Sequence, residues 1–181
     1  MQVNAPEPVV PRHDDRTIVL HWLTAIVVGS LWTLGQIIDW FPKGTPRISA
    51  RSTHILLGAV LILILCMRIA WRARSGSRLP LAVPGWLGYL GRATHYALYA
   101  LLITTVVLGV MNVWCRGDRF YGLFVFPKLA ADGETLKTTV EDLHAFSANL
   151  LVIVAVLHAL AALGHHFIRR DGVMRRMLRR G

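Results

Sequence analysis

The sequence predicts an all-α membrane protein, a four-transmembrane-helix bundle, on the basis of its composition and the placement of its charges. Hydrophobic residues make up 54% of the 181 residues, and charged residues only 17%. Four apolar runs are long enough to cross a bilayer, which takes about 20 residues. Most of the charged residues lie between these runs. This pattern is typical of a multi-pass membrane protein, and the length is that of one domain.

The apolar runs define the expected domain boundaries. Residues 1–16 are rich in proline and charge and should form a polar cytoplasmic leader, which lacks the apolar region of a cleaved signal peptide. Residues 17–170 should form the membrane domain, and residues 171–181 a basic cytoplasmic tail. The helices of this domain are expected at about residues 17–39, 52–72, 90–114 and 141–168.

The segments between the runs carry the residue types of loops. Residues 41–53 and 72–92 contain proline, glycine, serine and arginine, and we expect both to be loops. The longest connection, residues 115–142, mixes charged and aromatic side chains. A short interfacial helix would fit this connection.

The basic residues predict the orientation in the membrane. The net charge of +10 does not indicate nucleic-acid binding, because the basic residues flank apolar segments instead of forming one basic arm. The positive-inside rule places both termini in the cytoplasm. The inner set has thirteen residues: Arg12, Arg16, Arg68, Arg72, Arg74, Arg78, Arg92, Arg169, Arg170, Arg175, Arg176, Arg179 and Arg180. The outer set has seven: Lys43, Arg47, Arg51, Arg116, Arg119, Lys128 and Lys137.

Histidines inside the apolar runs are the candidate functional residues. His144 and His158 are fourteen residues apart, so they share one helix face and lie about 21 Å apart along the axis. Histidine is costly in a membrane helix and usually faces a partner in the bundle. Two levels of histidine indicate two metal-centred cofactors, and haem with axial histidines suits a helix bundle.

The direction of each helix pairs these histidines by depth. His21 begins the first helix at the inner face, and His158 lies at the same level. His54 begins the second helix at the outer face, where His144 also lies. We therefore expect His21 and His158 to ligate an inner haem b iron, and His54 and His144 an outer one.

Three further residues are candidates for cofactor binding. Arg68 lies fourteen residues after His54, at the inner level, where it could pair with a haem propionate or extend to the cytoplasmic interface. Arg51 could bind the outer propionates in the same way. His95 could bond an inner propionate or line a quinone pocket.

Several motifs resemble the bacterial cytochrome b561 family. They are His21-Trp22, THILLG from Thr53, DLHAFSANL from Asp142, and the ending GHHF-x-x-x-D-x-x-x-x-R-M from Gly164 to Met177. The resemblance extends from about Arg16 to Met177, and the cytochrome b subunits of hydrogenases and formate dehydrogenases are similar in plan. It implies a di-haem electron carrier of the bacterial inner membrane that exchanges electrons with ubiquinone. The family's four haem ligands map onto His21, His54, His144 and His158.

The resemblance leaves two functions open. A related superoxide oxidase passes electrons from superoxide to quinone, and the outer basic residues could steer a small anion to the outer haem. We therefore expect a superoxide:ubiquinone oxidoreductase with no catalytic residues beyond the haems. The alternative is a haem-bearing membrane anchor subunit that passes electrons between a soluble dehydrogenase or hydrogenase and quinone. Another electron donor could replace superoxide, and a second copy of the chain or a soluble redox protein could be a partner. Acidic residues partly offset the outer charge: Asp118, Asp132, Glu134, Glu141 and Asp142.

Overall fold

The computed structural model describes residues 12–75, 79–128 and 134–178. Four long helices run through this part of the chain, and each is long and apolar enough to cross a membrane. The predicted four-helix membrane bundle is therefore confirmed. The helices are α1 (Asp15–Ile37), α2 (Thr45–Ser75), α3 (Trp86–Arg116) and α4 (Glu134–Gly164).

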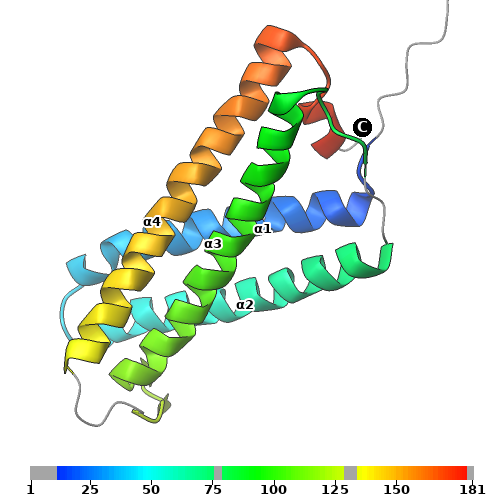
Figure 1. Ribbon diagram of the computed structural model, residues 1–181. Helices are drawn as coiled ribbons and strands as arrows, with labels where there is room; N and C mark the ends of the chain where they lie inside the picture. The colour runs from blue at the N-terminus through cyan, green and yellow to red at the C-terminus, as the bar shows by residue number, and fades with distance from the viewer. Residues whose placement is uncertain (1–11, 76–78, 129–133, 179–181) are drawn as a thin grey trace, which may run out of the picture.

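The helices form two antiparallel pairs that cross each other (Figure 1). Helix α1 packs mainly along α2, and α3 along α4, while direct contacts between the pairs are few. A cluster of buried leucines from all four helices joins the pairs. Leu151 of this cluster lies seven residues from both His144 and His158, so the cluster occupies the middle of the membrane. Its buried members are Leu31, Leu61, Leu65, Leu102 and Leu151.

Helices α1 and α2 begin earlier than their apolar runs predicted. Helix α1 begins at Asp15, within the expected leader, because the Asp14 side chain caps it by accepting a hydrogen bond from the Thr17 N–H at 2.9 Å. Helix α2 begins at Thr45, within the expected loop. Gly44 has φ +99, and Pro46 lies in the first turn of the helix, where proline is favourable. Arg47 and Arg51 therefore lie on α2 and not in a loop.

Helices α3 and α4 also extend beyond the expected limits. Helix α3 lies between Gly85 and Gly117, and both of these flanking residues have a positive φ, which favours glycine. Helix α4 begins at Glu134, about two polar turns before the apolar run that was expected to start it. After Gly164 the chain makes one π-helical turn, η2 (His165–Arg169), and Arg170 then has φ +53. The membrane-crossing cores were predicted, but the polar turns that extend them were not.

A small β-hairpin lies in the first part of the connection for which the sequence allowed a short interfacial helix. Strand β1 (Arg119–Phe120) pairs with β2 (Phe124–Val125), with Phe120 opposite Phe124. Tyr121 and Gly122 both have positive φ, which is the backbone of a tight hairpin turn. The Leu123 N–H closes this turn by donating to Phe120 O at 2.9 Å.

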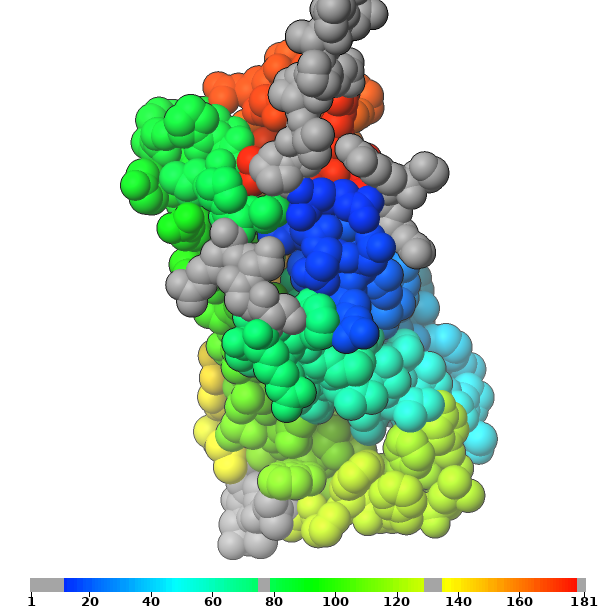
Figure 2. All heavy atoms as spheres, turned by 90° about the vertical axis from the view of Figure 1, so that its right-hand side faces the viewer, coloured from blue at the N-terminus to red at the C-terminus, as the bar shows by residue number. Residues whose placement is uncertain are grey.

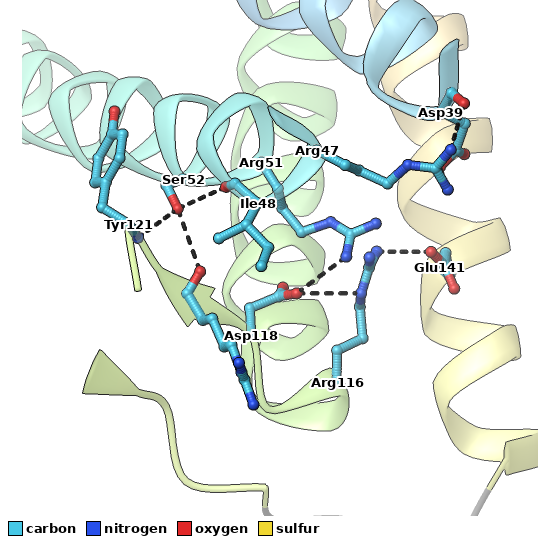
Figure 3. Close-up of polar contacts among 10 residues, drawn as sticks. Asp39, Arg47, Ile48, Arg51, Ser52, Arg116, Asp118, Tyr121 and Glu141 are labelled. Carbon is cyan, nitrogen blue, oxygen red and sulfur yellow. Dashed lines mark hydrogen bonds and ion pairs between the residues drawn. The ribbon is translucent and has the colours of Figure 1, made fainter. Parts of the chain in front are cut away.

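Ser52 anchors this hairpin to the start of α2 (Figure 3). The side chain has no exposed surface. Its hydroxyl accepts a hydrogen bond from the Tyr121 N–H at 2.8 Å and lies 2.8 Å from Ile48 O and 3.2 Å from Arg119 O. Buried groups bonded in this way hold the hairpin in one position. We call this end of the bundle the hairpin end.

The opposite end carries the start of α1 and the last described turn of the chain, and we call it the terminal end. The C-terminal turn η3 (Met174–Met177) lies beside the start of α1 (Figure 2). The Trp22 indole donates to Met177 O at 3.0 Å, and the His13 N–H donates to Arg176 O at 3.2 Å. The Arg176 side chain donates to Pro80 O at 2.8 Å. Residues 1–11 of the leader, Arg78, Arg179 and Arg180 fall outside the described residues, as do residues 129–133.

Candidate functional site

Two pairs of histidines lie between the crossed helix pairs. The ring centres of His21 on α1 and His158 on α4 are 6.4 Å apart. Those of His54 on α2 and His144 on α4 are 6.2 Å apart. The structure therefore brings together the same partners that helix direction and depth paired. One pair lies toward the terminal end and the other toward the hairpin end.

The spacing of each pair suits two ligands on opposite sides of one metal ion. Metal–imidazole bonds are about 2 Å long, and each ring centre lies about 1 Å beyond its nitrogen, so two such ligands in line have centres about 6 Å apart. The part of the chain that the structure describes holds no group of three or more histidine, cysteine or acidic side chains placed to bind a metal. A haem brings four nitrogens of its own and needs only two axial ligands.

The backbone orients the ring of His144. Its Nδ1 lies 3.0 Å from Thr105 O, and only a protonated Nδ1 can donate to this carbonyl. The other ring nitrogen, Nε2, is then left without a proton and available to a metal ion. The Thr105 hydroxyl donates to Ser147 at 3.1 Å, and the Ser147 hydroxyl donates to His144 O at 3.0 Å. These bonds join α3 to the turn of α4 that carries the histidine.

Two glycines make room for the rings at the hairpin end. A Cβ atom on Gly109 would lie 3.0 Å from Cε1 of His144, and one on Gly35 would lie 3.5 Å from Cε1 of His54. Sequence reasoning missed both residues. A signal was present for Gly35, which follows His21 by fourteen residues and so shares its face of α1. In contrast, a Cβ on Gly29 or Gly58 would meet nothing within 4 Å.

His54 has a ring nitrogen without a partner. Its Nδ1 is buried, and no described residue forms a hydrogen bond with it. A buried polar atom left unpaired is costly, so such atoms in native proteins usually have a partner. The Asn112 side-chain oxygen, three residues after Gly109 on α3, is buried and unpaired in the same way. The hairpin-end pair thus lies with buried polar atoms that have no partner among the described residues, which fits a site that binds a further group.

The terminal-end pair has two polar neighbours. The ring centre of His95 lies 5.0 Å from that of His158, and its Nδ1 lies 2.8 Å from Gly91 O. The Arg68 guanidinium donates to the Thr24 hydroxyl at 2.9 Å and lies 5.2 Å from the centre of the Tyr99 ring. Thr24 is one turn from His21, so Arg68 lies near the level of this pair. Arg68 and His95 therefore both lie near the terminal-end pair.

A charged cavity of about 320 Å³ lies at the hairpin end (Figure 3). Asp118, only 8% exposed, lies 3.5 Å from both the Arg51 and the Arg116 guanidinium groups. Arg116 also donates to Glu141 at 2.6 Å. Burial raises the pKa of the Asp118 carboxyl, and the positive charges of Arg116 and Arg51 oppose this rise. The lining residues are Ile48, Arg51, Arg116, Gly117, Asp118, Arg119 and Lys137.

Two arginines that were expected from the sequence to bind a cofactor or to attract anions, Arg51 and Arg47, have partners within the protein. Arg51 was expected to face a haem propionate, and in the structure its charge partner is Asp118. Arg47 lies outside the cavity lining, and its guanidinium donates to Phe41 O at 2.8 Å and Asp39 O at 2.7 Å. Positive charge exceeds negative charge in the cavity lining, because four lining residues are basic and one, Asp118, is acidic. The basic residues are Arg51, Arg116, Arg119 and Lys137.

Comparisons with known proteins agree with this architecture. Residues 12–180 match the family model described as prokaryotic cytochrome b561. The chain is 31% identical to cytochrome b561 homolog 2 of Escherichia coli, over 97% of this chain and 93% of the relative. It is 28% identical to cytochrome b561 homolog 1 of the same organism, over 93% and 98%. It is 27% identical to the probable superoxide oxidase CybB of Yersinia pestis, over 89% and 92%.

The family match extends over nearly the whole chain and includes all four helices and both histidine pairs. Membership in this family implies binding of b-type haem, which the two facing imidazole pairs and the unpaired ring nitrogen of His54 fit. The chain therefore belongs to the prokaryotic cytochrome b561 family of multi-pass membrane electron-transfer proteins.

Proposed function

We propose that the protein is a di-haem cytochrome b that passes electrons from a donor outside the bacterial inner membrane to ubiquinone. The observation that carries this proposal is the presence of two histidine pairs, with ring centres 6.4 Å and 6.2 Å apart, at two levels. His54 and His144 would hold one haem, and His21 and His158 the other. The bound haems would supply one-electron transfer between the two levels.

The distribution of basic residues supports the orientation. Most of the basic residues lie at the terminal end, which the positive-inside rule places in the cytoplasm. The hairpin end, with its charged cavity, then faces outward. Trp40, which is 82% exposed where α1 ends, suits the outer membrane interface.

Superoxide is the donor that the hairpin end favours. The cavity concentrates positive charge close to the His54–His144 pair, and such a field attracts small anions. A relative is named a probable superoxide oxidase. In the balanced reaction, two superoxide ions each lose one electron and become two molecules of O₂. Ubiquinone gains both electrons and two protons and becomes ubiquinol.

Three other residues would assist cofactor binding. Arg51 at the hairpin end and Arg68 at the terminal end are cations that propionate groups could approach. His95 keeps Nε2 free beside the terminal-end pair, where it could bond a propionate or a quinone.

A second candidate function has one observation in its favour. The tip of the β-hairpin exposes Leu123, Phe124 and Val125, with exposed fractions of 80%, 50% and 58%. An apolar tip of this kind could contact a soluble dehydrogenase, which would make the protein a membrane anchor subunit. Quinone reduction by the purified protein with superoxide as donor distinguishes the two functions. A purified anchor subunit should show no such reduction.

The two haems should depend on different histidines. Replacing His21 or His158 by Ala should remove one haem, and replacing His54 or His144 should remove the other, because each iron needs both axial ligands. Redox titration of each purified variant measures which haem remains. The control His166→Ala should keep both haems. A His21→Ala variant that retained the same haem as His54→Ala would contradict the pairing.

Gly109 should be required for haem binding at the hairpin end. Its replacement by Ala places a Cβ 3.0 Å from the His144 ring, and overpacking of this kind costs about 1–3 kcal/mol. Such a cost weakens haem affinity by about 5- to 150-fold. Haem retention during dilution and the redox titration report this loss. Gly29→Ala is the matched control, and equal retention in both variants would show that the clearance is unimportant.

The reaction with superoxide should depend on ionic strength. The Debye length falls from about 30 Å at 0.01 M salt to about 8 Å at 0.15 M, which shortens the reach of the cavity's charge. The Arg51→Gln/Arg116→Gln variant should therefore be reduced more slowly at low salt, with an unchanged haem spectrum. Stopped-flow absorbance measures this rate, and Arg92→Gln at the terminal end is the control. A rate that is independent of salt and of the double substitution would argue against superoxide.

A further inference from the structure

Three polar side chains meet on the lipid-facing seam between α1 and α4. The Trp32 indole donates to Asn149 Oδ1 at 2.8 Å, and the Gln36 amide donates to the same oxygen at 3.3 Å. All three side chains are exposed, although they lie within the spans Asp15–Trp40 and Thr135–Arg169. We call them the seam cluster.

The hydrogen bonds within the seam cluster leave two polar atoms without a partner among the described residues. Both donors share a single acceptor, and the structure assigns no partner to the Asn149 amide nitrogen or the Gln36 carbonyl oxygen among the described residues. Polar groups that face hydrocarbon are costly, and intramembrane polar side chains commonly mark functional sites. The seam cluster therefore needs a partner that the bilayer itself carries.

The seam cluster lies close to the hairpin-end histidine pair. Asn149 follows His144 by five residues, which is about 7.5 Å along the axis of α4. Gln36 follows Gly35, whose Cβ position lies 3.5 Å from the His54 ring. Trp40, at the outer interface, is one turn beyond Gln36. A ligand on the seam cluster would thus lie between the level of the expected outer haem and the central leucine cluster, because Leu151 of that cluster is only two residues after Asn149.

We propose that the seam cluster binds the head group of the quinone acceptor, so that quinone is reduced near the hairpin-end pair. The two carbonyl oxygens of a quinone accept hydrogen bonds only, and the free amide N–H groups of Asn149 and Gln36 are donors. The Trp32 indole provides a flat apolar surface for the ring. Because the seam faces lipid, the isoprenoid tail remains in the bilayer. The two protons that complete quinol formation come from the aqueous phase.

This inference rests on the proposed function, and its test separates the two. The holoprotein in nanodiscs is compared with the Asn149→Leu and Gln36→Leu variants, and Ser30→Ala, which changes another exposed polar residue of α1, is the control. We expect the KM for a short-chain ubiquinone to rise about tenfold in both Leu variants, as loss of a hydrogen bond would cause, with haem reduction by superoxide unchanged. An azido-ubiquinone photolabel should attach to peptides that contain Trp32 and Asn149.

Three other results would contradict the seam site, and they can be told apart. An unchanged KM, with the label attached near His95, would overturn the seam site and leave quinone reduction intact. A wild-type protein that neither reduces nor is labelled by the quinone would contradict both the proposed function and the seam site. Loss of a cross-linked dimer in the Leu variants, without a change in labelling, would instead assign the seam cluster to a contact between two copies of the chain.

Discussion

Four imidazole rings inside the membrane set the plan of this protein. Each ring carries two polar nitrogens into a region that has no water, and each needs a partner there. A central leucine cluster joins the helix pairs, and the histidine pairs lie between them toward either end. The leucine cluster thus fills the middle of the bundle and separates the two levels at which imidazole rings face each other.

The two ends of the bundle differ in the contacts that hold them together. At the hairpin end, Ser52 fixes the hairpin, and two arginines share Asp118, so the cavity keeps a positive charge in a fixed position. At the terminal end, the C-terminal turn bonds to the start of α1 and to the loop before α3. Under the proposed function, the fixed positive field at the hairpin end would attract an anionic donor from solution, and the seam cluster would bind an acceptor that stays in lipid.

The features that could be predicted from the sequence were the membrane helices and the polar histidine side chains within them. The long apolar runs predicted the number of membrane helices. The fourteen-residue spacing in α4, together with the direction of each helix, predicted which histidines would face His144 and His158. The ends of α2 and α4 could not be predicted from hydropathy, because polar helical turns continue past the membrane core. The hairpin, the pairing of Arg51 with Asp118 and the clearance at Gly109 depend on contacts between distant segments, which no local pattern reveals.

The central claim is that each histidine pair holds one b-type haem, and the number of haems per chain tests it most directly. A pyridine haemochrome assay on the purified wild-type protein, combined with amino-acid analysis for the protein concentration, measures this number. The account predicts two b-type haems per chain. One haem or none in fully loaded protein would contradict it.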